Sequence, residues 1–233
     1  MPVSVRLAAL AALPLGAALT AFAPRAPRQE PTAASVIDRA SRAFSKAKTV
    51  RATFEQTLNN PVTGNESKAS GEILLSQPNR VAVRFTQPSG DRVIGDGTWL
   101  WVYMPSAAPN QVIKLPAKGK GVTGVDALGD LLTAPRTRYT VTGGTAATVG
   151  GRATRVVTLV PKVDGQPIER AKVWVDDADD AVRQVEITDA NGLVRTLRMT
   201  TWTLNASVPA STFRFEVPKG VRVVDRSALV GSR

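Results

Sequence analysis

The chain has 233 residues, carries a formal net charge of +11 and contains neither histidine nor cysteine. This length can bury one sizeable core without disulfide bonds, and the missing residue types exclude thiolate chemistry and any nucleophile–base pair that relies on histidine. The positive balance favours acidic partners, but the basic residues are scattered along the chain, which indicates solvated strand faces rather than a nucleic-acid-binding arm.

The first 23 residues have the layout of a secretory signal peptide. Arg6 precedes an apolar run over residues 7–23 that ends in small residues. A retained N-terminal anchor is the alternative, although Pro14 interrupts the run. We therefore predict an exported protein with a signal peptide at 1–23, followed by a Pro- and Arg-rich linker at 24–32.

The hydrophobic period then changes from that of a helix to that of a strand. Residues 33–47 place Ile37 and Phe44 on one apolar stripe, which predicts an amphipathic helix. Between residues 49 and 58 apolar and polar side chains alternate, which predicts a β-strand with one face toward a core.

Residues 67–105 carry the densest pattern of β-branched and aromatic residues in the chain. Gly, Pro, Asn and Asp separate three runs, which are Glu72–Leu75, Arg80–Thr86 and Thr98–Met104. Short runs bounded by such residues predict an antiparallel meander. Gln111–Leu115 adds one further short strand.

The faces of this meander are unusually apolar. Val81, Val83 and Phe85 fall on one face of their strand. The next strand is apolar on both faces, with Leu100 and Val102 on one face and aromatic residues on the other. Both faces must therefore be covered. A dry core beneath lid helices and a cavity lined by one face are alternatives that the sequence leaves open.

A second short helix is predicted at Asp126–Leu132, where Leu128, Leu131 and Leu132 share one face and Pro135 stops the helix. The Gly- and Lys-rich segment before it lacks the glycine spacing of a phosphate-binding loop. We therefore predict a mobile loop there.

The second half of the chain is predicted to be nearly all β. Its strands are Arg138–Thr142, Arg155–Val160, Arg170–Val175, Val182–Ile187, Leu193–Leu204, Phe213–Val217 and Val221–Val224. Paired turn residues, Gly143-Gly144 among them, mark hairpin turns. So many consecutive antiparallel strands predict a complete or partial barrel, or a strongly curled sheet, with the helices across an opening.

No catalytic constellation emerges from the polar residues. The acidic cluster Asp176–Asp180 lacks the glycine and closing glutamate of a calcium loop, so we predict a solvated hairpin turn. Asp91 and Asp96 lie near strand ends, where turn formation explains them. No Gly-x-Ser-x-Gly elbow is present. We predict neither enzymatic activity nor a metal or cofactor.

Several short motifs follow one another in a fixed order along the chain. They are Phe54-x-Gln56, Gly71-Glu72-Ile73-Leu74, Gln77-Pro78-Asn79-Arg80, Asp96-Gly97-x-x-Leu100-Trp101-x-Tyr103-x-Pro105, Leu159-x-Pro161-Lys162, Val173-Trp174-Val175-Asp176 and Phe213-Arg214-Phe215-x-x-Pro218. Each motif is weak by itself. Together, on a chain with a predicted signal peptide, they resemble the periplasmic outer-membrane lipoprotein carrier family of LolA type.

The resemblance implies a mainly β (α+β) fold for residues 33–225, followed by a tail at 226–233. The expected architecture is a half-open antiparallel β-barrel with short lid helices over a hydrophobic cavity for the acyl chains of lipoproteins. A periplasmic monomer without a cofactor is implied. Its implied partners are an inner-membrane lipoprotein-releasing ABC complex and an outer-membrane lipoprotein receptor.

The resemblance also implies roles for individual residues. The expected cavity wall consists of Val81, Val83, Phe85, Leu100 and Val102, and the expected lid of Leu128, Leu131 and Leu132 with Ile37 and Phe44. Gln77 stands where the family has a basic residue that ties the lid shut, and an uncharged amide forms weaker hydrogen bonds. Two alternatives are a carrier of another envelope lipid or glycolipid, and an envelope-stress lipid sensor of the same fold.

Overall fold

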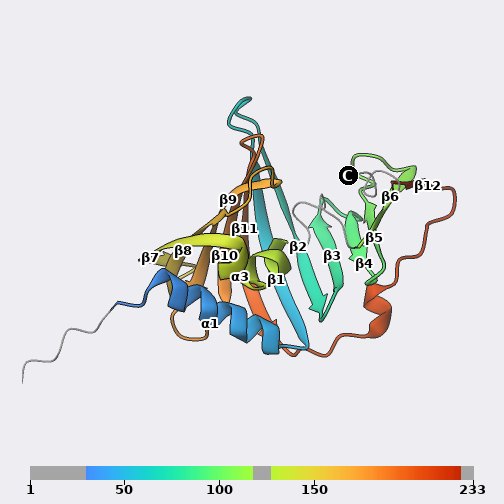
Figure 1. The fold of residues 1–233 in the computed structure, drawn as a ribbon. Helices are drawn as coiled ribbons and strands as arrows, with labels where there is room; N and C mark the ends of the chain where they lie inside the picture. Colours follow the sequence, from blue (N-terminus) through green and yellow to red (C-terminus); the bar gives the residue numbers. More distant parts are fainter. Residues whose placement is uncertain (1–29, 118–126, 227–233) are drawn as a thin grey trace, which may run out of the picture. The chain divides into compact units, whose positions relative to one another are not determined.

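The computed structural model describes residues 30–117 and 127–226. The described residues from Pro31 onward belong to one compact unit, and the description below concerns that unit (Figure 1). The predicted signal peptide, most of the linker, most of the predicted Gly- and Lys-rich loop, Asp126 and nearly all of the predicted tail lie outside the described residues.

A twelve-stranded sheet dominates the unit, with the strand order β12-β6-β5-β4-β3-β2-β1-β11-β10-β9-β8-β7 (Figure 1). The strands are β1 (Thr49–Asn59), β2 (Glu66–Ser76), β3 (Arg80–Gln87), β4 (Arg92–Gly95), β5 (Trp99–Tyr103), β6 (Gln111–Pro116), β7 (Tyr139–Val149), β8 (Arg152–Pro161), β9 (Ile168–Asp176), β10 (Val182–Asp189), β11 (Val194–Leu204) and β12 (Arg222–Asp225). The order is linear, with β7 and β12 at opposite edges, so the sheet is open. The predicted half-open, mainly β architecture is confirmed.

Helix α1 (Ala33–Lys46) begins at Thr32, whose side-chain oxygen accepts a hydrogen bond from the Ser35 backbone N–H at 3.2 Å. It packs on β7, β8 and β9 and touches the short helices α2 (Ala127–Leu132) and α3 (Pro135–Arg138). We call the face of the sheet that carries α1 the inner face, and the opposite face the outer face (Figure 1).

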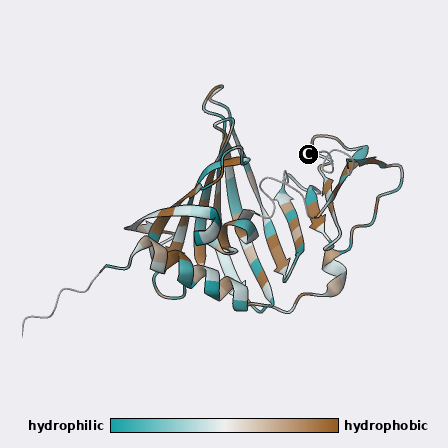
Figure 2. Ribbon diagram, viewed as in Figure 1, coloured by the Kyte–Doolittle hydropathy of each residue, from teal (hydrophilic) through white to brown (hydrophobic). Residues whose placement is uncertain are grey.

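Apolar side chains gather on both faces, although unequally. The inner face carries the main core, to which β1 contributes Val50, Ala52 and Phe54 at every second position. The outer face carries a smaller cluster. Figure 2 shows the corresponding hydrophobic bands across the strands. The period of two that predicted these strands therefore reflects a real division between two faces.

The outer cluster is completed by the segment that follows β11. Phe213 is buried against Leu74 and Ile94. Phe215 stacks on Trp101 with ring centroids 5.3 Å apart. This segment therefore covers Trp101 and Tyr103 on the aromatic face of β5, while Val102 on the opposite face stays half-buried.

That arrangement contradicts two predictions. Phe213–Val217 is not a strand: Phe213 ends a short 3-10 helix (Ala210–Phe213), and its alternation with Phe215 reflects packing on the outer face. The sheet is also not wholly antiparallel, because β12 pairs with β6 in parallel. The covering segment joins β11 to β12 and so brings the chain to the edge of the sheet beside β6.

The glycine pair Gly143-Gly144 was predicted to be a hairpin turn, and this is wrong. Strand β7 continues through it, and its pairing with β8 shifts register between Gly143 and Thr145. A Cβ on Gly143 would lie 2.8 Å from the Val156 carbonyl oxygen, and one on Gly144 would lie 3.1 Å from the Ala33 nitrogen. The pair therefore forms a bulge where the start of α1 approaches β7.

Candidate functional site

The register aligns apolar side chains in rows across the inner face. Ile73, Val83, Val93 and Val102 are consecutive partners on β2, β3, β4 and β5. Val93 in this row is fully buried, whereas Val102 is half-buried. The inner face thus becomes more accessible toward β5.

All the apolar residues predicted for the site belong to the inner-face core. The buried ones are Ile37, Phe44, Val81, Val83, Leu100, Leu128, Leu131 and Leu132. Phe85 and Val102 pack against this cluster and are half-buried, as are Met104 and Leu115. The structure therefore brings these residues together. Their role as a binding surface stays a prediction.

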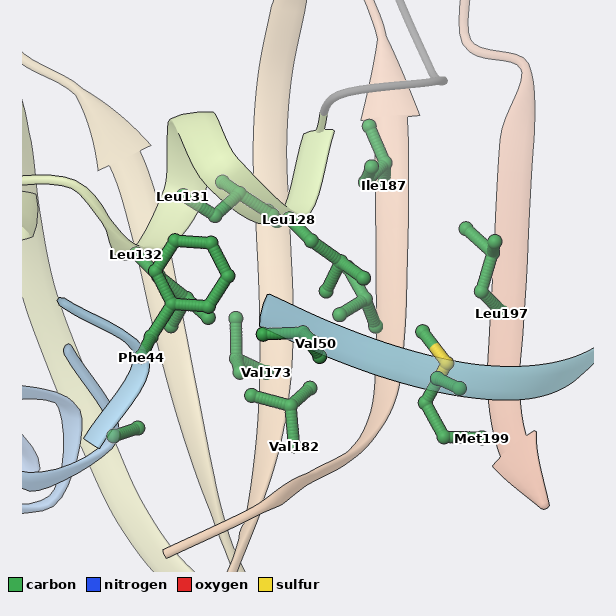
Figure 3. Close-up of a cluster of buried hydrophobic side chains, with 14 of the residues drawn as sticks. Phe44, Val50, Leu128, Leu131, Leu132, Val173, Val182, Ile187, Leu197 and Met199 are labelled. Carbon is green, nitrogen blue, oxygen red and sulfur yellow. The ribbon is translucent and has the colours of Figure 1, made fainter. Parts of the chain in front are cut away.

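Strands β9, β10 and β11 contribute core residues that the site prediction omitted. Figure 3 shows Phe44 of α1 and Leu132 of α2 beside one another, close to Val173 of β9. Ile187 and Leu197 extend the same core along β10 and β11. Their alternation was visible in the sequence, but no motif of the resemblance falls on β10 or β11.

Helix α2 and its neighbour α3 are tied to α1 by polar contacts. The Ser41 side-chain oxygen donates a hydrogen bond to the Leu132 carbonyl at the end of α2, over 2.7 Å. Arg136 of α3 forms an ion pair with Asp38 at 3.1 Å. Helices α2 and α3 are thereby fastened to α1, which sequence reasoning did not foresee.

Gln77, the predicted latch position, lies exposed in the turn between β2 and β3. Its backbone N–H donates to the Lys48 carbonyl at 2.9 Å. Within the described residues its side chain forms no hydrogen bond. A latch at Gln77 stays a prediction, whereas the contact of Ser41 is present in the structure.

The acidic cluster is a hairpin turn, as predicted, but it is not simply solvated. Asp176 is buried, and its carboxylate accepts hydrogen bonds from the Arg152 Nε at 2.7 Å and the Arg183 Nε at 2.8 Å. Arg39 of α1 pairs with Asp180 at 2.8 Å. The turn between β9 and β10 therefore joins two strands and α1 in one ion-pair network.

The pKa of Asp176 reflects this network. Burial alone raises the pKa of the carboxyl group, but hydrogen bonds from Arg152, from the Ala178 N–H and from Arg183 outweigh that effect. The pKa therefore lies well below its usual range, and the carboxylate stays ionised.

No helix in residues 30–117 and 127–226 is both long enough and apolar enough to cross a membrane.

An open, mainly β half-barrel with short helices on one apolar face defines the structural class of this protein. The family described as "Outer membrane lipoprotein carrier protein LolA" matches residues 45–216. This match spans most of the chain, and the chain belongs to that family. The family is one of carriers rather than enzymes.

Individual relatives agree with this assignment. An outer-membrane lipoprotein carrier protein of Chromobacterium violaceum is 25% identical over 211 residues, which cover 91% of this chain and 98% of that protein. One of Leptothrix cholodnii is 29% identical over 178 residues and covers 76% of this chain and 79% of its own length. An uncharacterized conserved protein of Thermus thermophilus shares the fold with a TM-score of 0.53 at 13% identity, over 83% of this chain and 99% of that one.

Proposed function

We propose that this protein is a periplasmic carrier that binds the acyl chains of lipoproteins on its inner face and shuttles them from the inner to the outer membrane. The observation that carries the proposal is the graded burial of the inner face. Its apolar rows are closed under α1 and α2 and become half-buried at Phe85, Val102, Met104 and Leu115. The relatives from two organisms are named outer-membrane lipoprotein carrier proteins, which supports the same role.

The physical requirement is to shield long acyl chains from water and still release them. Each buried methylene contributes about 0.8 kcal/mol, so an unshielded acyl chain cannot cross an aqueous compartment. Helix α2 has six residues and covers the core through Leu128, Leu131 and Leu132. Displacement of α2 by an acyl chain would offset part of the binding free energy, and the return of α2 would assist release.

The proposed location and partners follow from the same role. The predicted signal peptide at residues 1–23 directs export, and a carrier between two membranes must receive and deliver its cargo. An inner-membrane lipoprotein-releasing ABC complex would supply the lipoprotein, and an outer-membrane lipoprotein receptor would accept it. The carrier acts as a monomer, because a monomer leaves the inner face free for cargo.

The direct test is the formation of a soluble complex with acylated cargo. The purified protein is mixed with a detergent-solubilised triacylated lipoprotein, or with the same protein lacking its acylated cysteine. After removal of detergent, gel filtration should show a complex with the acylated form alone. Precipitation of the acylated lipoprotein in the presence of an equimolar amount of carrier would contradict the proposal.

Removal of the Ser41 hydroxyl should loosen the lid. A hydrogen bond of this kind contributes about 1 kcal/mol, so Ser41→Ala should lower the melting temperature of the empty protein by about 2–4 °C. If α2 must move to admit cargo, the same free energy should raise the affinity for acylated lipoprotein up to about fivefold. Calorimetry and a binding titration measure the two changes.

Ser45→Ala is the matched control, because among the residues that the structure describes the Ser45 side-chain oxygen donates to the Ser41 carbonyl within α1 and to no group of α2. It should leave the affinity for cargo unchanged. An affinity that falls in Ser41→Ala would mean that α2 forms part of the binding surface and is not displaced.

A further inference from the structure

Arg195 occupies an unusual position on the apolar inner face. It pairs with Leu58 of β1 and with Ile187 of β10. On β11 it is two residues before Leu197 and four before Met199, both of which are buried in the inner-face core. Because side chains alternate along a strand, Arg195 lies on the same face as these two residues (Figure 3 shows Ile187, Leu197 and Met199 in that core).

The guanidinium of Arg195 has no hydrogen-bond or ion-pair partner within the described residues. The residue is half-buried, and desolvation lowers its pKa, while the charge of Asp189 acts in the opposite direction. An Oδ of Asp189 instead accepts hydrogen bonds from the backbone N–H groups of Asn191 and Leu193 at 2.8 and 3.0 Å. A half-buried charge without a hydrogen-bonded partner is costly, so a ligand group is its natural complement.

Two other arginines of the same sheet have ion-pair partners. Arg198, on the outer face of β11, lies 3.7 Å from a Glu55 carboxylate oxygen. Arg155, which the register of β8 places on the inner face, lies 3.4 Å from Asp177. Arg195 thus differs from both a surface arginine and a buried arginine of the same sheet.

We propose that Arg195 is an anion-binding subsite for an acylated ligand, and that it holds a phosphate or carboxylate attached to chains that lie on the inner face. A guanidinium presents paired N–H donors that match the two oxygens of such an anion, and a partly desolvated site strengthens these bonds. The subsite rests on the proposed function, because it requires acyl chains on the inner face. It extends the ligand class from lipoproteins to anionic lipids.

The test compares two lipids and two variants. Short-chain phosphatidylglycerol carries a phosphate, whereas the diacylglycerol with the same chains carries none. Wild-type protein should bind phosphatidylglycerol about tenfold more tightly than diacylglycerol, which corresponds to about 1.4 kcal/mol. Arg195→Gln should remove this preference. Arg198→Gln, on the opposite face of the same strand, should retain it.

Two further measurements test whether a loss of lipid binding reflects a folding defect and whether a free anion alone can occupy the subsite. Arg195→Gln should leave the melting temperature unchanged or raise it, because the change removes a partly desolvated charge. Inorganic phosphate alone should not compete with phosphatidylglycerol, since it lacks the acyl chains. Competition by inorganic phosphate, or a lower melting temperature with equal loss of both lipids, would overturn the subsite.

The outcomes also distinguish the subsite from the proposed function. If wild type and Arg195→Gln bind both lipids with the same affinities, the anion subsite is wrong and the apolar site stands. If wild type binds acylated lipoprotein but neither of the two lipids, the anion subsite is wrong and the proposed function is unaffected. If wild type does not bind acylated lipoprotein either, both the anion subsite and the proposed function are wrong.

Discussion

Asp176→Asn should lower the free energy of unfolding by about 3 kcal/mol at neutral pH. The carboxylate is buried and accepts hydrogen bonds from Arg152 and Arg183, and the Arg183 side chain is only 14% exposed. Loss of the Asp176 charge leaves the two arginines with only the half-exposed Asp179 as a partner, and loss of a buried member of an ion-pair network is far more costly than loss of a surface pair. Urea unfolding of the two proteins measures the difference.

Asp179→Asn is the control for this change. Asp179 bonds the same two arginines, Arg152 at 3.2 Å, but its side chain is 47% exposed. Solvent screens an exposed pair, so its loss should cost less than about 1 kcal/mol. Equal destabilisation by the two variants would mean that burial of Asp176 is not what makes the network stabilising.

The effect of Asp176→Asn should depend on pH with a definite sign. The pKa of Asp176 is lowered in the folded protein and is about 3.9 in an unfolded chain. Such a group stabilises the fold fully above its unfolded pKa and loses this contribution as the pH falls toward the folded pKa. The stability difference between wild type and Asp176→Asn should therefore be constant above about pH 5 and shrink below about pH 4. If the free energies of unfolding of the two proteins differ by the same amount down to about pH 2, the expected pH dependence is wrong.

The sequence correctly predicted those helices and strands whose hydrophobic pattern lies within the element itself. The apolar stripe with Ile37 and Phe44 identified α1, and period-two runs identified most strands. Strand β4 (Arg92–Gly95) was missed, because four residues between two aspartates are too short to show alternation. Asp96 does form the expected turn, with its carboxylate accepting from the backbone N–H of Trp99 at 2.7 Å, whereas the buried Asp91 accepts from the backbone N–H of the distant Ser106 at 3.0 Å.

Predictions failed where distant residues decide the outcome. The burial of Asp176 depends on Arg152 and Arg183, which neighbouring strands supply. The same pattern in an isolated hairpin would be solvated. The alternation of Phe213 and Phe215 matches that of a strand, and only the exposed aromatic face of β5 shows why it packs on the sheet instead. Composition and spacing cannot reveal such partners.

A carboxylate on the inner face should abolish the binding of acyl chains. Val83 is 4% exposed and Val102 is half-buried in the same row across β3, β4 and β5. An uncompensated charge beside an acyl chain costs several kcal/mol, so Val83→Glu and Val102→Glu should each weaken binding of acylated lipoprotein by about a hundredfold or more. Gel filtration with labelled cargo measures the loss.

The stability of the two variants separates a dry core from a cavity that solvent can enter. At Val83 the charge must be buried, so Val83→Glu should fold but with a clearly lower melting temperature than Val102→Glu. Val160→Glu, at a 42% exposed position on the outer face of β8, should change neither stability nor binding. If Val83→Glu unfolds, β3 belongs to a dry core, and binding by Val102→Glu then decides whether the half-buried part of the inner face is the site. Normal binding by a folded Val102→Glu would place the acyl chains elsewhere, because a carboxylate in direct contact with them could not be tolerated.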